Sequence, residues 1–153
     1  MHLLLQAPVD SGDTAWVIVC TALVLLMTPG LAFFYAGMVR SKNALGIIMQ
    51  SFVTIAVVSV TWVLVGYSLA FDDDAGAGLV GGLHLFGLSH AEVSVPGLDL
   101  SIPPLAFVTF QMMFAILTAA LLSGAVADRM RFGAFVTLIA IWSVVVYAPL
   151  ANW

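Results

Sequence analysis

Three phenylalanines, Phe107, Phe110 and Phe114, are spaced along one apolar run in a pattern that could do chemistry. Positions i, i+3 and i+7 fall on one side of a helix, so the three rings form a stripe, with Gln111 as its main polar neighbour. Such a stripe commonly faces lipid or packs in a core. The sharper hypothesis is a stack of rings that closes a narrow vestibule and presents a ring face to a small cation.

Other kinds of chemistry have little support in the sequence. There is no nucleophile–base arrangement and no glycine-rich phosphate loop, so we predict no enzyme, no catalytic residue and no cofactor. His84 and His90 invite a metal site with the acidic run at 72–74, but their spacing matches no metal-site template, and we expect solvated loop side chains and no metal. No basic patch exists to bind nucleic acid.

The elements that must position these residues are four uncharged apolar stretches, at residues 16–39, 44–71, 105–127 and 132–153. Each matches the ~20 residues that a helix needs to cross a bilayer. Only 8% of the residues are charged, against about 25% in an ordinary soluble domain. The sequence therefore predicts an all-α polytopic membrane protein, surrounded by lipid, with one domain over 1–153. Pro29-Gly30 is expected to interrupt the first helix in its middle.

The charges predict how the chain crosses the membrane. All four Lys/Arg residues lie in the two short connections, at 40–43 and 128–131, whereas the long connection 72–104 and the N-terminal segment carry Asp or Glu and no Lys or Arg. Because positive charge marks cytoplasmic loops, the N-terminus and the loop 72–104 are expected outside. The acidic run in that loop either raises the local cation concentration or is merely a soluble turn.

Five segments carry familiar motifs. They are residues 28–43 (TPGLAFFYAGMVRSKN), 62–71, 107–115, 124–132 and 147–151. In this order, and over nearly the whole chain, they resemble the first four membrane helices of the ammonium transporters (the Amt/Mep/Rh family).

The resemblance implies a protomer of eleven helices, homotrimeric when full length, in the inner or plasma membrane. It implies transport of ammonium or ammonia through a narrow pore, with ammonium recruited at an outer vestibule by cation–π contacts. Phe110 and Phe114 match the stacked gating phenylalanines, and Phe114 also matches the recruitment ring. Gln111 matches a polar residue beside the gate, and Tyr35 a tyrosine near the inner pore. A cytoplasmic nitrogen-signalling protein is a candidate partner.

The sequence also departs from the family pattern. Asp128 stands where Glu is common and Asn152 where His is common, and the vestibule tryptophan would fall just beyond Trp153. The fifth helix with its aspartate, the two pore histidines and the later helices are missing. We therefore expect an N-terminal fragment that holds half of a gate, has no conduction path and does not transport by itself.

Three alternatives remain open. A Rhesus-like gas channel or an ammonium sensor would use the same fold and the same phenylalanine pair. A small four-helix membrane scaffold or regulatory subunit would need only packing faces, and its phenotype would not depend on the phenylalanines.

Overall fold

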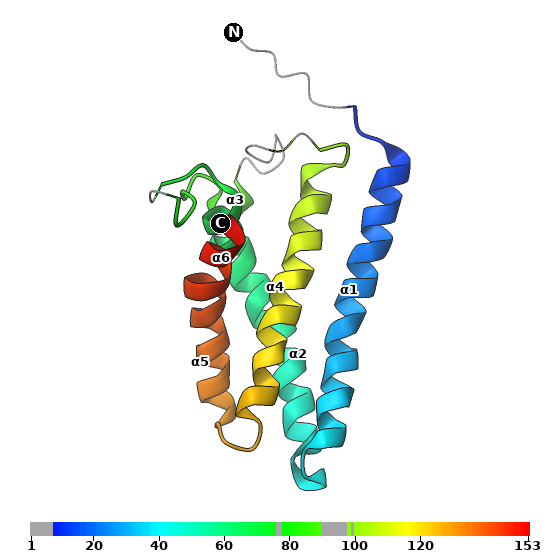
Figure 1. Ribbon diagram of the computed structural model, residues 1–153, viewed down its shortest axis with the longest axis vertical. Coiled ribbons are helices and arrows are strands. Elements are labelled where there is room, and N and C mark those ends of the chain that lie inside the picture. Colours follow the sequence, from blue (N-terminus) through cyan, green and yellow to red (C-terminus); the bar gives the residue numbers. More distant parts are fainter. Residues whose placement is uncertain (1–7, 76–77, 90–97, 99) are drawn as a thin grey trace.

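The computed structural model describes residues 8–75, 78–89, 98 and 100–153. They form a bundle in which successive long helices run in opposite directions (Figure 1). Four spans are long and apolar enough to cross a membrane: Ser11–Met38, Ser41–Phe71, Pro104–Val126 and Phe132–Asn152. Over the described residues there is no strand, and Asp74 and Gly81 form an isolated bridge. The predicted class, an all-α protein with four membrane helices, is confirmed.

The described helical elements of these spans, and of the loop between the second and third spans, follow one another in chain order. They are α1 (Ser11–Met38), the 3-10 turn η1 (Ser41–Asn43), α2 (Ala44–Thr61), the π-helix η2 (Trp62–Gly66), α3 (Tyr67–Phe71), the 3-10 turn η3 (Phe86–Leu88), α4 (Pro104–Val126), α5 (Phe132–Trp142), the π-helix η4 (Ser143–Tyr147) and α6 (Ala148–Asn152).

The first helix begins earlier than its apolar stretch because a polar cap precedes it. The Asp10 carboxylate accepts a hydrogen bond from the backbone N–H of Asp13 at 2.8 Å, so the first turn forms ahead of Trp16. The helix then runs through Pro29 to Met38, and the expected interruption does not end it. In α4 the first residue is Pro104, where a missing N–H costs no helical hydrogen bond.

Helix α4 is one of the two inner elements of the bundle, and the other is α2. Helix α4 packs against α1 and α2, while α2 also packs against α5 and α3 against α6 (Figure 1). Most of the α4 positions without exposed surface are small, namely Ala115, Ala119, Ala120 and Ser123, and only Ile116 among them is large. Small side chains let helices in a membrane approach closely, and the Ser51 and Ser123 hydroxyls lie 3.5 Å apart across α2 and α4.

Two π-helices face each other in the outer half of the bundle. The hydroxyls of Thr61, just before η2, and of Ser143, the first residue of η4, are 3.0 Å apart. Trp62 is only 2% exposed and has rings of α3 and η4 around it. These contacts join the second and fourth spans near their outer ends.

The two basic connections lie at the same end of the bundle, opposite the C-terminus and the start of α1 (Figure 1). They are tied together there, because Asp128 accepts hydrogen bonds from the side chains of Arg40, at 3.4 Å, and Asn43. All four Lys/Arg residues therefore belong to one end, which the positive-inside rule assigns to the cytoplasm.

Candidate functional site: an aromatic pair on the open side of α4

Phe110 and Phe114 lie edge to face on consecutive turns of α4. Their ring centroids are 5.1 Å apart and their planes meet at 85°. This T-shaped arrangement places the positive edge of one ring against the negative face of the other, which is a favoured geometry for aromatic pairs. Both side chains are half-buried.

The pair points away from the part of α4 that packs against α2. At about 100° of rotation per residue, Phe110 lies about 180° around the helix from the fully buried Ala119. Phe114 lies about 100° from the fully buried Ala115, on the same less buried side. The rings are therefore held by α4 but are not enclosed by the described helices.

The third member of the predicted stripe lies apart from this pair. Phe107 stacks on Phe71 of α3, with centroids 5.1 Å apart and planes at 80°. It packs against the hydrophobic core cluster rather than against the two neighbouring rings. The stripe thus divides into one structural ring and two rings on the open side.

Gln111 follows Phe110 on α4 and is half-buried. Among the described residues, its side-chain amide has no hydrogen-bond partner. The amide is therefore free to donate or accept a hydrogen bond beside the phenylalanine pair.

Tyr35 lies on α1 and is not brought together with the pair. Its hydroxyl donates to the carbonyl of Leu121 at 3.3 Å, and its ring lies against Gly124, where an added Cβ would be 2.5 Å from Cζ of the ring. Gly124 is ten residues beyond Phe114, or about 15 Å along the helix. Tyr35 is therefore a separate feature toward the cytoplasmic end.

Asp72, expected as a solvated member of the acidic run, is instead only 7% exposed, and that prediction is wrong for this residue. Its carboxylate accepts from the N–H groups of Asp73, at 2.9 Å, and His84, at 2.6 Å, and lies 3.2 Å from His84 Nδ1. Partial desolvation raises its pKa, but the backbone hydrogen bonds and the charge of His84 outweigh this effect and leave the pKa of Asp72 below its usual value. The carboxylate holds the loop onto the end of α3.

The idea of a metal site in this loop is not supported by the described residues, which hold no group of three or more candidate ligands. His90, the other histidine of that idea, lies outside them.

Sequence reasoning missed three features that only packing reveals: the burial of Asp72, the burial of Gln50 in α2, and the two facing π-helices. Asp72 had a faint signal, because Ser68 is four residues before it and both side chains meet the same loop. For the π-helices, the signal is the repeated spacing of Trp and Tyr five residues apart, at Trp62–Tyr67 and Trp142–Tyr147.

The helical spans and the aromatic pair together define a multi-span membrane protein with an apolar, ring-lined surface in its outer half. The model of the Ammonium Transporter Family matches residues 15–153, and the chain belongs to that family.

Relatives from distant organisms agree with this assignment. The chain is 48% identical over 158 residues to an ammonium transporter of Mycobacterium tuberculosis, covering 94% of this chain and 33% of that protein. It is 50% identical over 142 residues to an ammonium transporter of Bacillus subtilis, covering 93% and 35%. The chain thus spans about a third of the length of the curated relatives it matches. These relatives are named as transporters rather than as enzymes.

Solved structures show the same fold. Mep2 of Saccharomyces cerevisiae superposes with a TM-score of 0.87 at 33% identity, over 100% of this chain and 34% of that one. A protein described as a sensor Amt protein superposes with a TM-score of 0.81 at 29% identity, over 92% and 33%.

Proposed function

We propose that the protein to which this chain belongs transports ammonium or ammonia across the inner or plasma membrane, with Phe110 and Phe114 as its outer gate. The observation that carries this proposal is the edge-to-face pair on the open side of α4, within a chain of the ammonium transporter family.

The chemistry of the pair suits a small cation that must lose water. A ring face attracts a cation by about 0.5 to about 2 kcal/mol, depending on desolvation. This is enough to favour ammonium at the mouth but small beside the cost of moving a bare charge into hydrocarbon. An apolar constriction of this kind therefore passes a neutral molecule more readily than an ion.

Gln111 and Tyr35 take supporting roles in this proposal. The free amide of Gln111 beside Phe110 offers a hydrogen bond to the arriving ammonium. Tyr35 of α1 contacts Gly124, which lies about 15 Å further along α4 than Phe114. Tyr35 therefore belongs to the inner part of the path. No Asp, Glu, Lys, Arg or His lies within the apolar stretches 16–39, 44–71, 105–127 and 132–153, so any group that accepts the proton of ammonium lies elsewhere in the protein. No covalent catalysis is proposed.

The proposal extends to assembly. A homotrimer and a cytoplasmic nitrogen-signalling partner fit the family, and the end that carries all four Lys/Arg residues is where such a partner would meet the chain.

Uptake of radiolabelled methylammonium, in cells without their own ammonium transporters, tests the gate. Phe110→Ala and Phe114→Ala in the protein as its gene encodes it are expected to change uptake about tenfold, the equivalent of about 1.4 kcal/mol. Phe52→Ala, at a 44% exposed ring of α2, is the matched control and should leave uptake unchanged. If both gate variants are made in normal amounts and take up methylammonium like the parent, the gate assignment is wrong.

Ammonium sensing is a second candidate function, favoured by the likeness to the sensor Amt protein. A sensor would bind ammonium without sustained uptake. If ammonium protects the purified protein against heat and uptake is absent, the result would support sensing as the function in place of transport.

A further inference from the structure

Phe107 is the ring of the predicted stripe that is turned away from the gate pair. It lies near the start of α4, three residues before Phe110, and residues three apart on a helix are neighbours. Long side chains on a helix also lean toward the preceding turn, which brings the Phe110 ring toward the level of Phe107. On α4 alone the two rings could therefore meet, yet the Phe107 ring lies against Phe71 of α3 instead.

Phe71 is the partner that turns Phe107 away. The two ring centroids are 5.1 Å apart with planes at 80°, an edge-to-face contact between the last residue of α3 and the outer part of α4. Phe71 also contacts the rings of Trp62 and Tyr67, whose centroids lie 6.2 Å and 5.4 Å from its own. Because Trp62 and Tyr67 are only 2% and 0% exposed, they fix Phe71 from the side of the packed core.

Two hydrogen bonds keep these ring-bearing segments in place. The indole Nε1 of Trp62 donates to the carbonyl of Val108, the residue after Phe107, at 3.3 Å. The side-chain amide of Asn152 in α6 donates to the carbonyl of Ala70 in α3 at 3.2 Å. The outer ends of the second, third and fourth spans are thus tied together around the contact between the two phenylalanines.

The place of the Phe107 ring decides whether the gate pair is accessible from outside. The pair of Phe110 and Phe114 lies on the open side of α4, and a Phe107 ring placed on Phe110 would cover the face that attracts a cation. We propose that Phe71 is a positioning residue, which holds Phe107 off Phe110 and so keeps the mouth of the gate open. This inference rests on the proposed function and gives a role in it to two rings outside the gate pair.

The expected effect on uptake follows from the pairing of the rings. In Phe71→Leu the edge-to-face contact is lost, and Phe107 is free to pair with Phe110. A contact between two aromatic rings favours the paired arrangement about two- to tenfold. Apparent affinity falls with the fraction of protein in the competent arrangement, so the KM for methylammonium should rise about three- to tenfold while Vmax stays near that of the parent. Uptake is measured with the protein as its gene encodes it, in cells without their own ammonium transporters.

A double variant separates this role from a merely structural one. Phe107→Ala removes the ring that would cover the mouth, so its KM should stay close to that of the parent. For the same reason, Phe107→Ala added to Phe71→Leu should return the KM to about the parent value. If Phe71 only stabilised the bundle, the double variant would be at least as impaired as Phe71→Leu alone.

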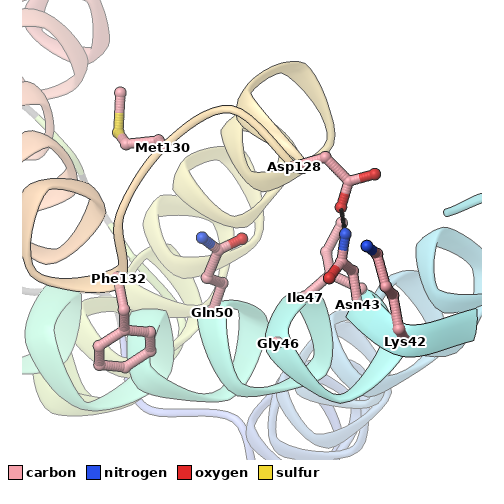
Figure 2. A pocket seen from close by; sticks show the side chains of 8 residues that line it. All are labelled: Lys42, Asn43, Gly46, Ile47, Gln50, Asp128, Met130 and Phe132. Carbon is pink, nitrogen blue, oxygen red and sulfur yellow. Dashed lines mark hydrogen bonds between the residues drawn. The ribbon is translucent and has the colours of Figure 1, made fainter. Parts of the chain in front are cut away.

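Two other phenylalanines give matched controls for the change to leucine. Phe86 lies in the outer loop and is 52% exposed. Phe132 lies at the opposite end of the bundle, where it lines a pocket of about 320 Å³ between the start of α2 and the connection from α4 to α5 (Figure 2). Phe86→Leu and Phe132→Leu should each leave the KM for methylammonium unchanged.

Fluorine NMR of the purified protein reports the place of the Phe107 ring directly, with 4-fluorophenylalanine incorporated at position 107. Phe71→Leu should shift the fluorine resonance. Adding Phe110→Ala to Phe71→Leu should shift it again, because Phe110 has become the partner of the labelled ring. Phe110→Ala alone should leave the resonance close to its place in the parent.

Three results would overturn the proposal. They are an unchanged KM in Phe71→Leu, a double variant as impaired as Phe71→Leu, and a fluorine resonance that ignores Phe110→Ala in the Phe71→Leu protein. Failure of the proposed function gives a different pattern, in which Phe110→Ala and Phe114→Ala leave uptake unchanged while the fluorine resonance still responds to Phe71→Leu. The role of Phe71 at the mouth would then be overturned together with the gate.

Discussion

The ring centroids of Trp62 and Tyr147 lie 6.0 Å apart, with their planes at 60°, where the two π-helices face each other. In each π-helix region a Trp is followed five residues later by a Tyr, and these rings are also neighbours, 6.0 Å apart for Trp62–Tyr67 and 6.3 Å for Trp142–Tyr147. In an α-helix, residues five apart point about 140° away from each other. The wider π turn brings them onto one side, and one aromatic cluster forms.

Replacing Trp62 by Ala is expected to lower the free energy of unfolding by about 3 kcal/mol, the lower part of the range for buried aromatic residues. Trp62 is 2% exposed and contacts the rings of Tyr67, Phe71 and Tyr147, so a cavity would remain. Unfolding in mixed detergent micelles, followed by circular dichroism, measures the loss. Trp16→Ala, at a 70% exposed ring, is the control and should change stability little. Equal losses in the two variants would mean that the aromatic cluster does not hold the bundle.

Gly124 is expected to tolerate no side chain because Tyr35 occupies the space. An added Cβ would lie 2.5 Å from Cζ of Tyr35, so Gly124→Ala must displace the ring and its hydrogen bond to Leu121. The expected cost is about 1–3 kcal/mol. Gly37→Ala is the matched control: its Cβ meets nothing within 4 Å, and the change should stabilise the helix by about 0.5–1 kcal/mol. The same unfolding assay measures both, and a neutral Gly124→Ala would show that Tyr35 is not fixed against α4.

The loop that follows α3 is expected to loosen in acid. Because the pKa of Asp72 is lowered in the folded protein, its stabilising effect is fully present above the ordinary value of about 3.9 and is lost as the pH falls through the lowered value. Cleavage by pepsin near Leu83 and Phe86, corrected for the activity of the protease on a free peptide, should increase as the pH is lowered below about 4.

A pair of variants separates this carboxylate from its neighbour at pH 7. Asp72→Asn removes the charge that accepts the N–H groups of Asp73 and His84 and should cost about 1–3 kcal/mol of loop stability. Asp73→Asn, at an exposed side chain, should change little. Chymotrypsin cleavage at Phe86 reports both, and similar rates in the two variants would argue against a structural role for Asp72.

The orientation of the chain predicts which single cysteines can be labelled from each side. With Cys20 replaced by Ser, Ala75→Cys should react with a membrane-impermeant maleimide in right-side-out vesicles, because Ala75 is exposed in the outer loop. Ser41→Cys, in the basic connection, should react only in inside-out vesicles. The reverse labelling pattern would show the opposite orientation of the chain in the membrane and would place the phenylalanine pair near the cytoplasm.

The sequence by itself determined the class of the protein and the position of its spans, because length and apolar character are local properties that suffice to specify a membrane helix. It also placed the cations at two connections, which the structure gathers at one end. The start of α1 differed by five residues from the expectation, since the Asp10 cap lies outside the apolar stretch. The spacing of Phe110 and Phe114 places them on consecutive turns of one helix, where their rings meet.

Only the tertiary structure decided which side of each helix is covered. A helix that is apolar all round carries no sequence pattern that says which side faces lipid and which faces a neighbour. For that reason the sequence could not separate Phe107 from Phe110, or bury Gln50 and Asp72. Those outcomes depend on the rotation of each helix and on residues far away in the chain, which become neighbours only when the helices pack.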